Sequence, residues 1–176
     1  MRNKSTQVAL GGLSAALCVT LMLSSAILPF STYALPMFAG IVLIPLAVEI
    51  GLSSAVIAYT AVSFLSVIIV PDYETSLMFI AFFGYYPLLR MKMYKIKLFP
   101  VRVIAKFVLF NLSMILVYYF LINLFGMVDL MNELSNGFGY LLLLMGNIGF
   151  ILYDFALLNL MRLYIHKIRK HIFHNK

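Results

Sequence analysis

Charged residues are scarce in this chain of 176 residues, at 11% of the total, whereas a soluble domain has about a quarter. Hydrophobic residues make up 64%. The core of a single small globule cannot enclose that much apolar surface, so the composition predicts a protein that lies in a lipid bilayer. Because apolar stretches continue toward the C-terminal end, we expect the first of them to be a membrane segment rather than a cleavable signal peptide.

Residues that carry metal-dependent or nucleophilic chemistry are equally scarce. Cys18 is the single cysteine, so a disulfide within the chain is impossible. The histidines, His166, His171 and His174, lack compact metal-ligand spacing, and we expect no metal site. The sequence contains no G-x-x-x-x-G-K-[ST], no H-E-x-x-H and no G-x-S-x-G. We therefore expect no enzyme, no resident cofactor and no ATP hydrolysis by a phosphate-binding loop of its own.

Six apolar stretches are present instead, each a candidate for a membrane-spanning helix, which takes about 17–25 residues. Strict alternation of apolar and polar residues, typical of a membrane β-barrel, is absent, so the chain is predicted to be all-α. The stretches are Val8–Leu28, Leu35–Ile50, Leu52–Val70, Tyr73–Leu89, Val103–Phe125 and Gly139–Met161. The sequence EIGLSS joins the second to the third and predicts a tight helical hairpin. Residues 1–176 are therefore expected to form a single six-helix transmembrane domain.

The basic residues predict the orientation of this bundle. Two precede the first stretch, six lie at the connection between the fourth and fifth, and five follow the sixth, which accounts for all 13. With six spans these segments lie on one side, and the positive-inside rule makes that side cytoplasmic. Both termini are then cytoplasmic, in the cell membrane. Topology and the anionic headgroups of the lipid bilayer explain the net charge of +7, so no nucleic-acid partner is expected.

The opposite face receives three polar loops, Pro29–Ala34, Pro71–Glu74 and Gly126–Phe138, which carry four of the six acids. Their polar and aromatic groups could capture a small solute from outside, although outer loops are often polar simply because they are wet. Asn147 is a polar residue inside the sixth stretch, and its depth allows it to reach an outward pocket.

Asp154 also lies inside the sixth stretch, and an ionisable group there is a functional candidate by default. Its position in the cytoplasmic half favours a structural role instead, as a link between helices through a hydrogen bond or an ion pair with a lysine such as Lys106. Tyr85 and Tyr86 lie near the cytoplasmic end of the fourth stretch, where an interfacial aromatic belt is expected.

Small residues recur at helical spacing in the first stretch. Gly11-x-x-x-Ala15 and Gly12-x-x-x-Ala16 each place two small residues on one face, which lets another helix approach closely. That helix belongs either to a separate membrane subunit or to the same chain, and the pattern alone favours the same chain.

Together, the six stretches, the tight hairpin, the polar outer loops and the opening VALGGLSAALCVTLMLSSAILPF resemble the S components, the substrate-binding subunits of energy-coupling factor transporters. That family has Ala-x-x-x-Ala in its first helix, whereas a glycine is the first member here. The resemblance implies capture of a vitamin or related small solute. It also implies partnership with a transmembrane coupling subunit and two ATPase subunits, which would dock on Gly11, Gly12, Ala15 and Ala16.

The resemblance also implies that the outer loops, with Asn147 below them, line the solute site. The residues concerned are Tyr33, Asp72, Tyr73, Glu74, Asp129, Glu133 and Asn147. The alternative is a non-transporting membrane scaffold of the MreD type in cell-envelope assembly, for which a dry outer face is expected. A self-sufficient carrier or channel would need several coupled ionisable groups along its transport path. Asp154 alone gives this alternative little support.

Overall fold

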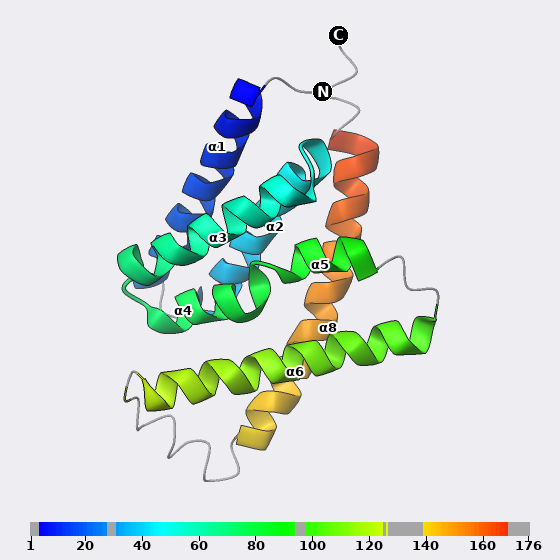
Figure 1. Cartoon of the computed structure of the whole chain (residues 1–176). Helices are drawn as coiled ribbons and strands as arrows, with labels where there is room; N and C mark the ends of the chain where they lie inside the picture. Colours follow the sequence, from blue (N-terminus) through cyan, green and yellow to red (C-terminus); the bar gives the residue numbers. More distant parts are fainter. Residues whose placement is uncertain (1–3, 28–30, 94–97, 125, 127–138, 169–176) are drawn as a thin grey trace.

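The computed structural model describes residues 4–27, 31–93, 98–124, 126 and 139–168 (Figure 1). All regular elements in this part of the chain are helices, as the composition predicts. In chain order they are α1 (Lys4–Leu23), α2 (Ala34–Glu49), α3 (Leu52–Ile69), α4 (Tyr73–Met78), a π-helical segment (Phe79–Phe83), α5 (Tyr86–Met93), α6 (Phe99–Asn123) and α8 (Gly139–Leu163). A 3₁₀ turn follows α1 and a π-helical turn follows α8.

Four of the described helices are long and apolar enough to cross a membrane. They cover Lys4–Ala26, Leu52–Ile69, Phe99–Asn123 and Gly139–His166. The other two predicted spans have a different form. The apolar helix α2 has only 16 residues, and the fourth predicted span is divided into α4, the π-helical segment and α5. The composition and these helices indicate a membrane protein.

The hairpin between α2 and α3 is as tight as the sequence predicts. Only Ile50 and Gly51 separate the two helices. Gly51 has a φ of +129°, in a region that side chains with a Cβ rarely adopt, so glycine is needed at this turn.

The interruption of the fourth predicted span involves Gly84 and Pro87. In the π-helical segment the amide of Gly84 donates to the carbonyl of Phe79 at 2.8 Å, five residues back. A Cβ at Gly84 would lie 2.7 Å from the ring of Tyr59, so this residue must be small. Pro87 follows in the first turn of α5 and has no amide hydrogen to donate to a continuing helix.

Two apolar clusters form the interior, and α2 contributes to both. One contains buried residues of α1, α2 and α3, among them Cys18, Leu43 and Val62. The other joins α2 to the π-helical segment, α5, α6 and α8, and is rich in aromatic rings. Figure 1 shows α6 crossing α8 in this second part of the molecule. The position of α2 therefore connects the N-terminal helices to the crossed pair.

The contact between α2 and the π-helical segment yields a prediction about stability. A Cβ added to Gly40 would overlap the carbonyl oxygen of Phe83, a backbone atom that cannot move without shifting its helix. We expect G40A to lower the free energy of unfolding by about 1–3 kcal/mol, the usual cost of overpacking. Thermal unfolding in detergent, followed by far-UV circular dichroism, measures the effect.

The matched control is G12A, because a Cβ at Gly12 meets nothing within 4 Å. Alanine there should leave the melting temperature unchanged or raise it, since alanine favours helix more than glycine does. Equal melting temperatures for G40A and G12A would contradict the close approach of α2 to the π-helical segment.

Candidate functional site

A cavity of about 340 Å³ lies between α2, α6 and α8. It forms because α6 and α8 are held together at their crossing and separate beyond it. At the crossing, Lys106 pairs with Asp154 at 2.7 Å, and Asn111 and Asn147 exchange two side-chain hydrogen bonds of 3.0 Å. Past this point residues of both helices line the cavity, up to Tyr118 on α6 and Gly139 on α8.

The cavity wall is predominantly apolar and aromatic. Met37 of α2 and Phe83 of the π-helical segment meet Phe110 and Met114 of α6. The α8 wall contributes glycines, and their lack of side chains leaves space. A Cβ at Gly149 would meet nothing within 4 Å. Apolar, aromatic walls with a few polar groups are typical of small-molecule sites.

Three polar side chains meet at one end of this cavity. The hydroxyl of Tyr33 donates to Oε1 of Glu74 at 2.7 Å and lies 3.2 Å from the hydroxyl of Tyr118. Tyr33 and Tyr118 both line the cavity, whereas Glu74 does not line it and is connected to it through Tyr33. Burial raises the pKa of Tyr33, and the neighbouring Tyr118 and Glu74 raise it further, so its hydroxyl keeps its proton at neutral pH. The cluster thus presents two tyrosine hydroxyls at the cavity, and the Glu74 carboxylate holds one of them in place.

The structure gives the other predicted residues of the second loop a different environment. Asp72 is the N-cap of α4, and Oδ1 accepts from the amides of Glu74 at 3.0 Å and Thr75 at 3.4 Å. Its Oδ2 accepts from the Thr75 hydroxyl at 2.5 Å. These bonds satisfy amides at the helix start. Neither Asp72 nor the exposed Tyr73 lines the cavity.

Asn147 binds α8 to α6 at the crossing and does not line the cavity. Its amide group donates to Asn111 and to the carbonyl of Leu143, while the adjacent Gly146 lines the cavity. Two other predicted site residues, Asp129 and Glu133, lie outside the described residues. Of the predicted set, the structure brings together Tyr33 and Glu74 and places Asn147 one position from the wall.

The sequence contained a signal for the α6 wall that the prediction did not use. Phe110, Met114 and Tyr118 recur every four residues and therefore lie on one helical face. That spacing is also what an ordinary packed helix shows, so it marks a buried face but not a cavity.

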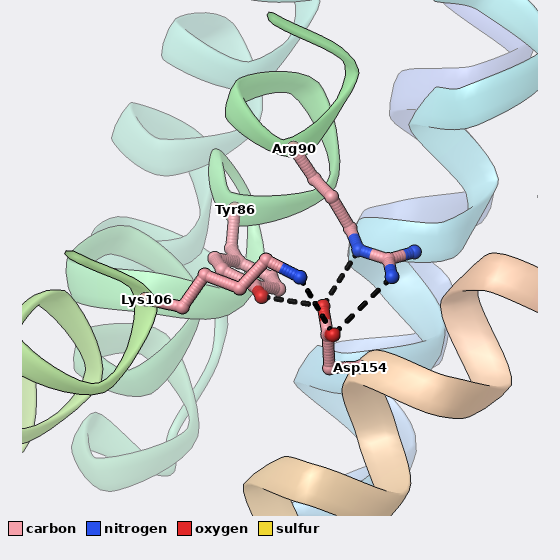
Figure 2. Close-up of polar contacts among 4 residues, drawn as sticks. All are labelled: Tyr86, Arg90, Lys106 and Asp154. Atoms are coloured by element: carbon pink, nitrogen blue, oxygen red, sulfur yellow. Dashed lines mark hydrogen bonds and ion pairs between the residues drawn. The ribbon is translucent and has the colours of Figure 1, made fainter. Parts of the chain in front are cut away.

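A largely buried ionic cluster also lies at the crossing, farther from the cavity than the asparagine pair (Figure 2). Asp154 of α8 is approached by Nε of Arg90 at 2.6 Å and by Nζ of Lys106 at 2.7 Å. The hydroxyl of Tyr86 donates to the same carboxylate at 2.6 Å. One carboxylate thus connects α5, α6 and α8 by pairing with two cations that have little exposure to solvent.

The pairing of Asp154 with Lys106 that the sequence suggested is confirmed. The interfacial aromatic belt was the wrong prediction for Tyr86, which is fully buried. Its ring stacks on Phe82, with centroids 4.6 Å apart, and its hydroxyl reaches the ionic cluster. The interruption before α5 turns this residue and Arg90 into the bundle, an outcome that a continuous helical pattern does not predict.

The predicted docking stripe lies largely on the outside of α1. Gly12 and Ala16 are exposed, and a Cβ at Gly11 or Gly12 would meet nothing within 4 Å. Ala15 is the exception, because it packs against the N-terminal apolar cluster. Packing within the chain therefore does not account for Gly12 and Ala16.

Comparison of the chain with protein-family models, with curated proteins and with solved structures gave no match. Among the described residues, no group of three or more His, Cys, Asp and Glu side chains is arranged to hold a metal ion. A function can therefore be inferred only from the cavity, the polar cluster at its end and the ionic cluster at the crossing.

The ionic cluster predicts a strong dependence of stability on Asp154. In D154N, Arg90 and Lys106 lose their shared carboxylate and remain buried as uncompensated charges. We expect a loss of about 3–5 kcal/mol in the free energy of unfolding. K106Q should cost less, because Arg90 and Asp154 still pair. Unfolding of both variants by denaturant in detergent tests this order, and equal stability of D154N and the unmodified protein would refute it.

Proposed function

We propose that the protein is a membrane-embedded solute-capture subunit of the energy-coupling factor type. In this proposal it crosses the cell membrane six times with both termini cytoplasmic. It takes up a vitamin or a related small solute from outside. A transmembrane coupling subunit and two ATPase subunits supply the energy.

The observation that carries the proposal is the apolar cavity with Tyr33, Glu74 and Tyr118 at its end. Its volume, about 340 Å³, lies within the range of small-molecule sites. Aromatic and methionine side chains suit a flat, largely apolar ring system, and the tyrosine hydroxyls and Glu74 suit a hydrogen-bonding group at its edge. The solute chemistry that fits is therefore amphiphilic, with one polar end.

The distribution of polar groups along the bundle supports the proposed orientation. The Tyr33 cluster lies where the first and second predicted outer loops meet. Arg90 and Lys106 lie in the ionic cluster at the crossing, and the asparagine pair lies between that cluster and Tyr33. Basic residues are expected on the cytoplasmic side, so the cavity end opens toward the outside. Figure 1 shows the start of α1 and the end of α8 at the same end of the molecule, as an even number of spans requires.

The exposed stripe on α1 supports docking of a separate subunit. Gly12 and Ala16 form an exposed surface of small residues on a helix long enough to span the bilayer. Small residues of this kind let two membrane helices approach closely. A scaffold of the MreD type could use the same surface, but it has no need for the cavity.

Filling the cavity should abolish solute capture. In G146L, the new side chain extends from α8 past the Phe110 ring, since a Cβ at Gly146 would lie 3.5 Å from that ring. We expect a small molecule to co-purify with the unmodified protein from its own host and to be lost from G146L. Native mass spectrometry of the gently solubilised protein detects the loss and gives the mass of the solute.

The matched control is A156L, a substitution of the same kind at an exposed position of α8 that does not line the cavity. It should retain the solute. G149L is a second cavity variant, with open space at its Cβ. If both cavity variants retain as much solute as A156L, or if the unmodified protein repeatedly carries none, capture at this cavity is refuted.

Enlarging the small residues on α1 should weaken subunit docking. In G12L/A16L, two bulky side chains hold a partner helix away, and the open space around Gly12 lets the bundle accept them. We expect co-purification of the coupling and ATPase subunits to fall by about tenfold or more. A61L/A156L, which adds the same bulk at exposed positions of α3 and α8, should co-purify them normally.

A further inference from the structure

A second cavity, of about 460 Å³, lies beyond the crossing, at the end of the bundle opposite the Tyr33 cluster. Four side chains that carry positive charge at neutral pH line it: Arg90, Arg102, Lys106 and Arg162. An adjoining cavity of about 340 Å³ shares the first three of these and also reaches Asp154. We call the two together the basic cavity.

The basic cavity has more positive than negative charge. Asp154 is its single acid among the described lining residues, and Arg90 and Lys106 already pair with it. Glu49, at the end of α2, accepts a hydrogen bond from Tyr164 at 3.4 Å and lines neither part. Among the described lining residues, positively charged side chains therefore outnumber carboxylates four to one in a partly enclosed space. An anion there would offset repulsion that water alone screens poorly.

The surroundings of the cations show what kind of anion fits. Met91, Leu158 and Met161 border one part of the cavity, and Phe107 and Phe155 border the other. A small hydrophilic anion would contact the cations but would gain nothing from the apolar side chains. An anion attached to hydrocarbon chains can contact both the cations and the apolar side chains. The cavity therefore favours an amphiphile with a negatively charged head.

The position of the cations along the helices fits the headgroup level of a bilayer. Arg102 is in the first turn of α6, and Arg162 is in the last turn of α8. Both helices are candidates to span the membrane, and a helix that does so has its ends at the level of the lipid phosphates. The guanidinium of Arg102 is also over the ring of Phe99, 5.4 Å from its centroid, which holds its side chain near the cavity.

We propose that the basic cavity binds the phosphate of an anionic phospholipid from the surrounding leaflet. Guanidinium groups bind phosphate oxygens through paired hydrogen bonds, and basic pockets between membrane helices are suited to lipid headgroups. The acyl chains lie against the methionine and phenylalanine side chains. Because the cations come from α5, α6 and α8, the bound phosphate adds a second ionic link between the elements that Asp154 connects.

The test compares lipid binding to R102Q/R162Q with binding to a charge-matched control. These two arginines are outside the Asp154 cluster, so the variant keeps that ionic link. The control, K4Q/K92Q, removes the same charge from two exposed lysines that do not line the cavity. Native mass spectrometry with phosphatidylglycerol and, separately, phosphatidylcholine measures the lipid retained. We expect the unmodified protein to prefer phosphatidylglycerol, and R102Q/R162Q to lose about tenfold or more in its apparent affinity for that lipid.

The control should retain phosphatidylglycerol within about twofold of the unmodified protein. Equal loss in R102Q/R162Q and K4Q/K92Q would overturn the proposal, because it would mean that general charge attracts the lipid. Equal retention of phosphatidylcholine would also overturn it. A titration with inorganic phosphate separates the two sources of phosphate. Stabilisation of the protein by millimolar phosphate that depends on Arg102 and Arg162, with no phosphatidylglycerol retained, would assign the site to a soluble anion instead.

Discussion

The carboxylate of Asp154 is the interaction on which the C-terminal half of this protein depends. It binds a cation from α5 and another from α6, and it accepts a hydrogen bond from Tyr86. Desolvating three charged groups is unfavourable, so the cluster is favourable only while its geometry is complete. This requirement fixes where α6 crosses α8. The apolar cavity opens on one side of that crossing and the basic cavity on the other, so both proposed sites follow from one ionic link.

Much of the fold could be predicted because it depends on composition and on local pattern. Apolar stretches predicted the helices, and the EIGLSS sequence predicted the turn at Gly51. The pairing of Asp154 with Lys106 could be predicted because an isolated charge in an apolar helix needs a partner. Arg90 was not predicted as a second partner. Its direction depends on the π-helical interruption, which arises from the contact between Gly84 and Tyr59, residues distant in sequence.

The candidate site was harder to predict from the sequence than the fold. A cavity depends on how the helices are spaced in three dimensions, which a local sequence pattern does not show. Loop polarity drew attention to Tyr33 and Glu74, which the structure brings together, but did not distinguish them from Asp72, whose carboxylate caps α4. Asn147 is polar within an apolar helix, yet Asn111 satisfies its side chain. Tyr118 and the lining glycines were missed because a tyrosine or a glycine in a membrane helix has several ordinary explanations.

The central claim is that the apolar cavity between α2, α6 and α8 holds a solute from outside the cell. An experimental structure of the protein, isolated from its own host membrane and placed in a lipid nanodisc, tests it most directly. The account predicts density for a compact, non-lipid molecule between Phe110 and Gly146, with its polar end toward Tyr33 and Glu74. A cavity filled by an acyl chain, or closed by the protein's own side chains, would contradict it.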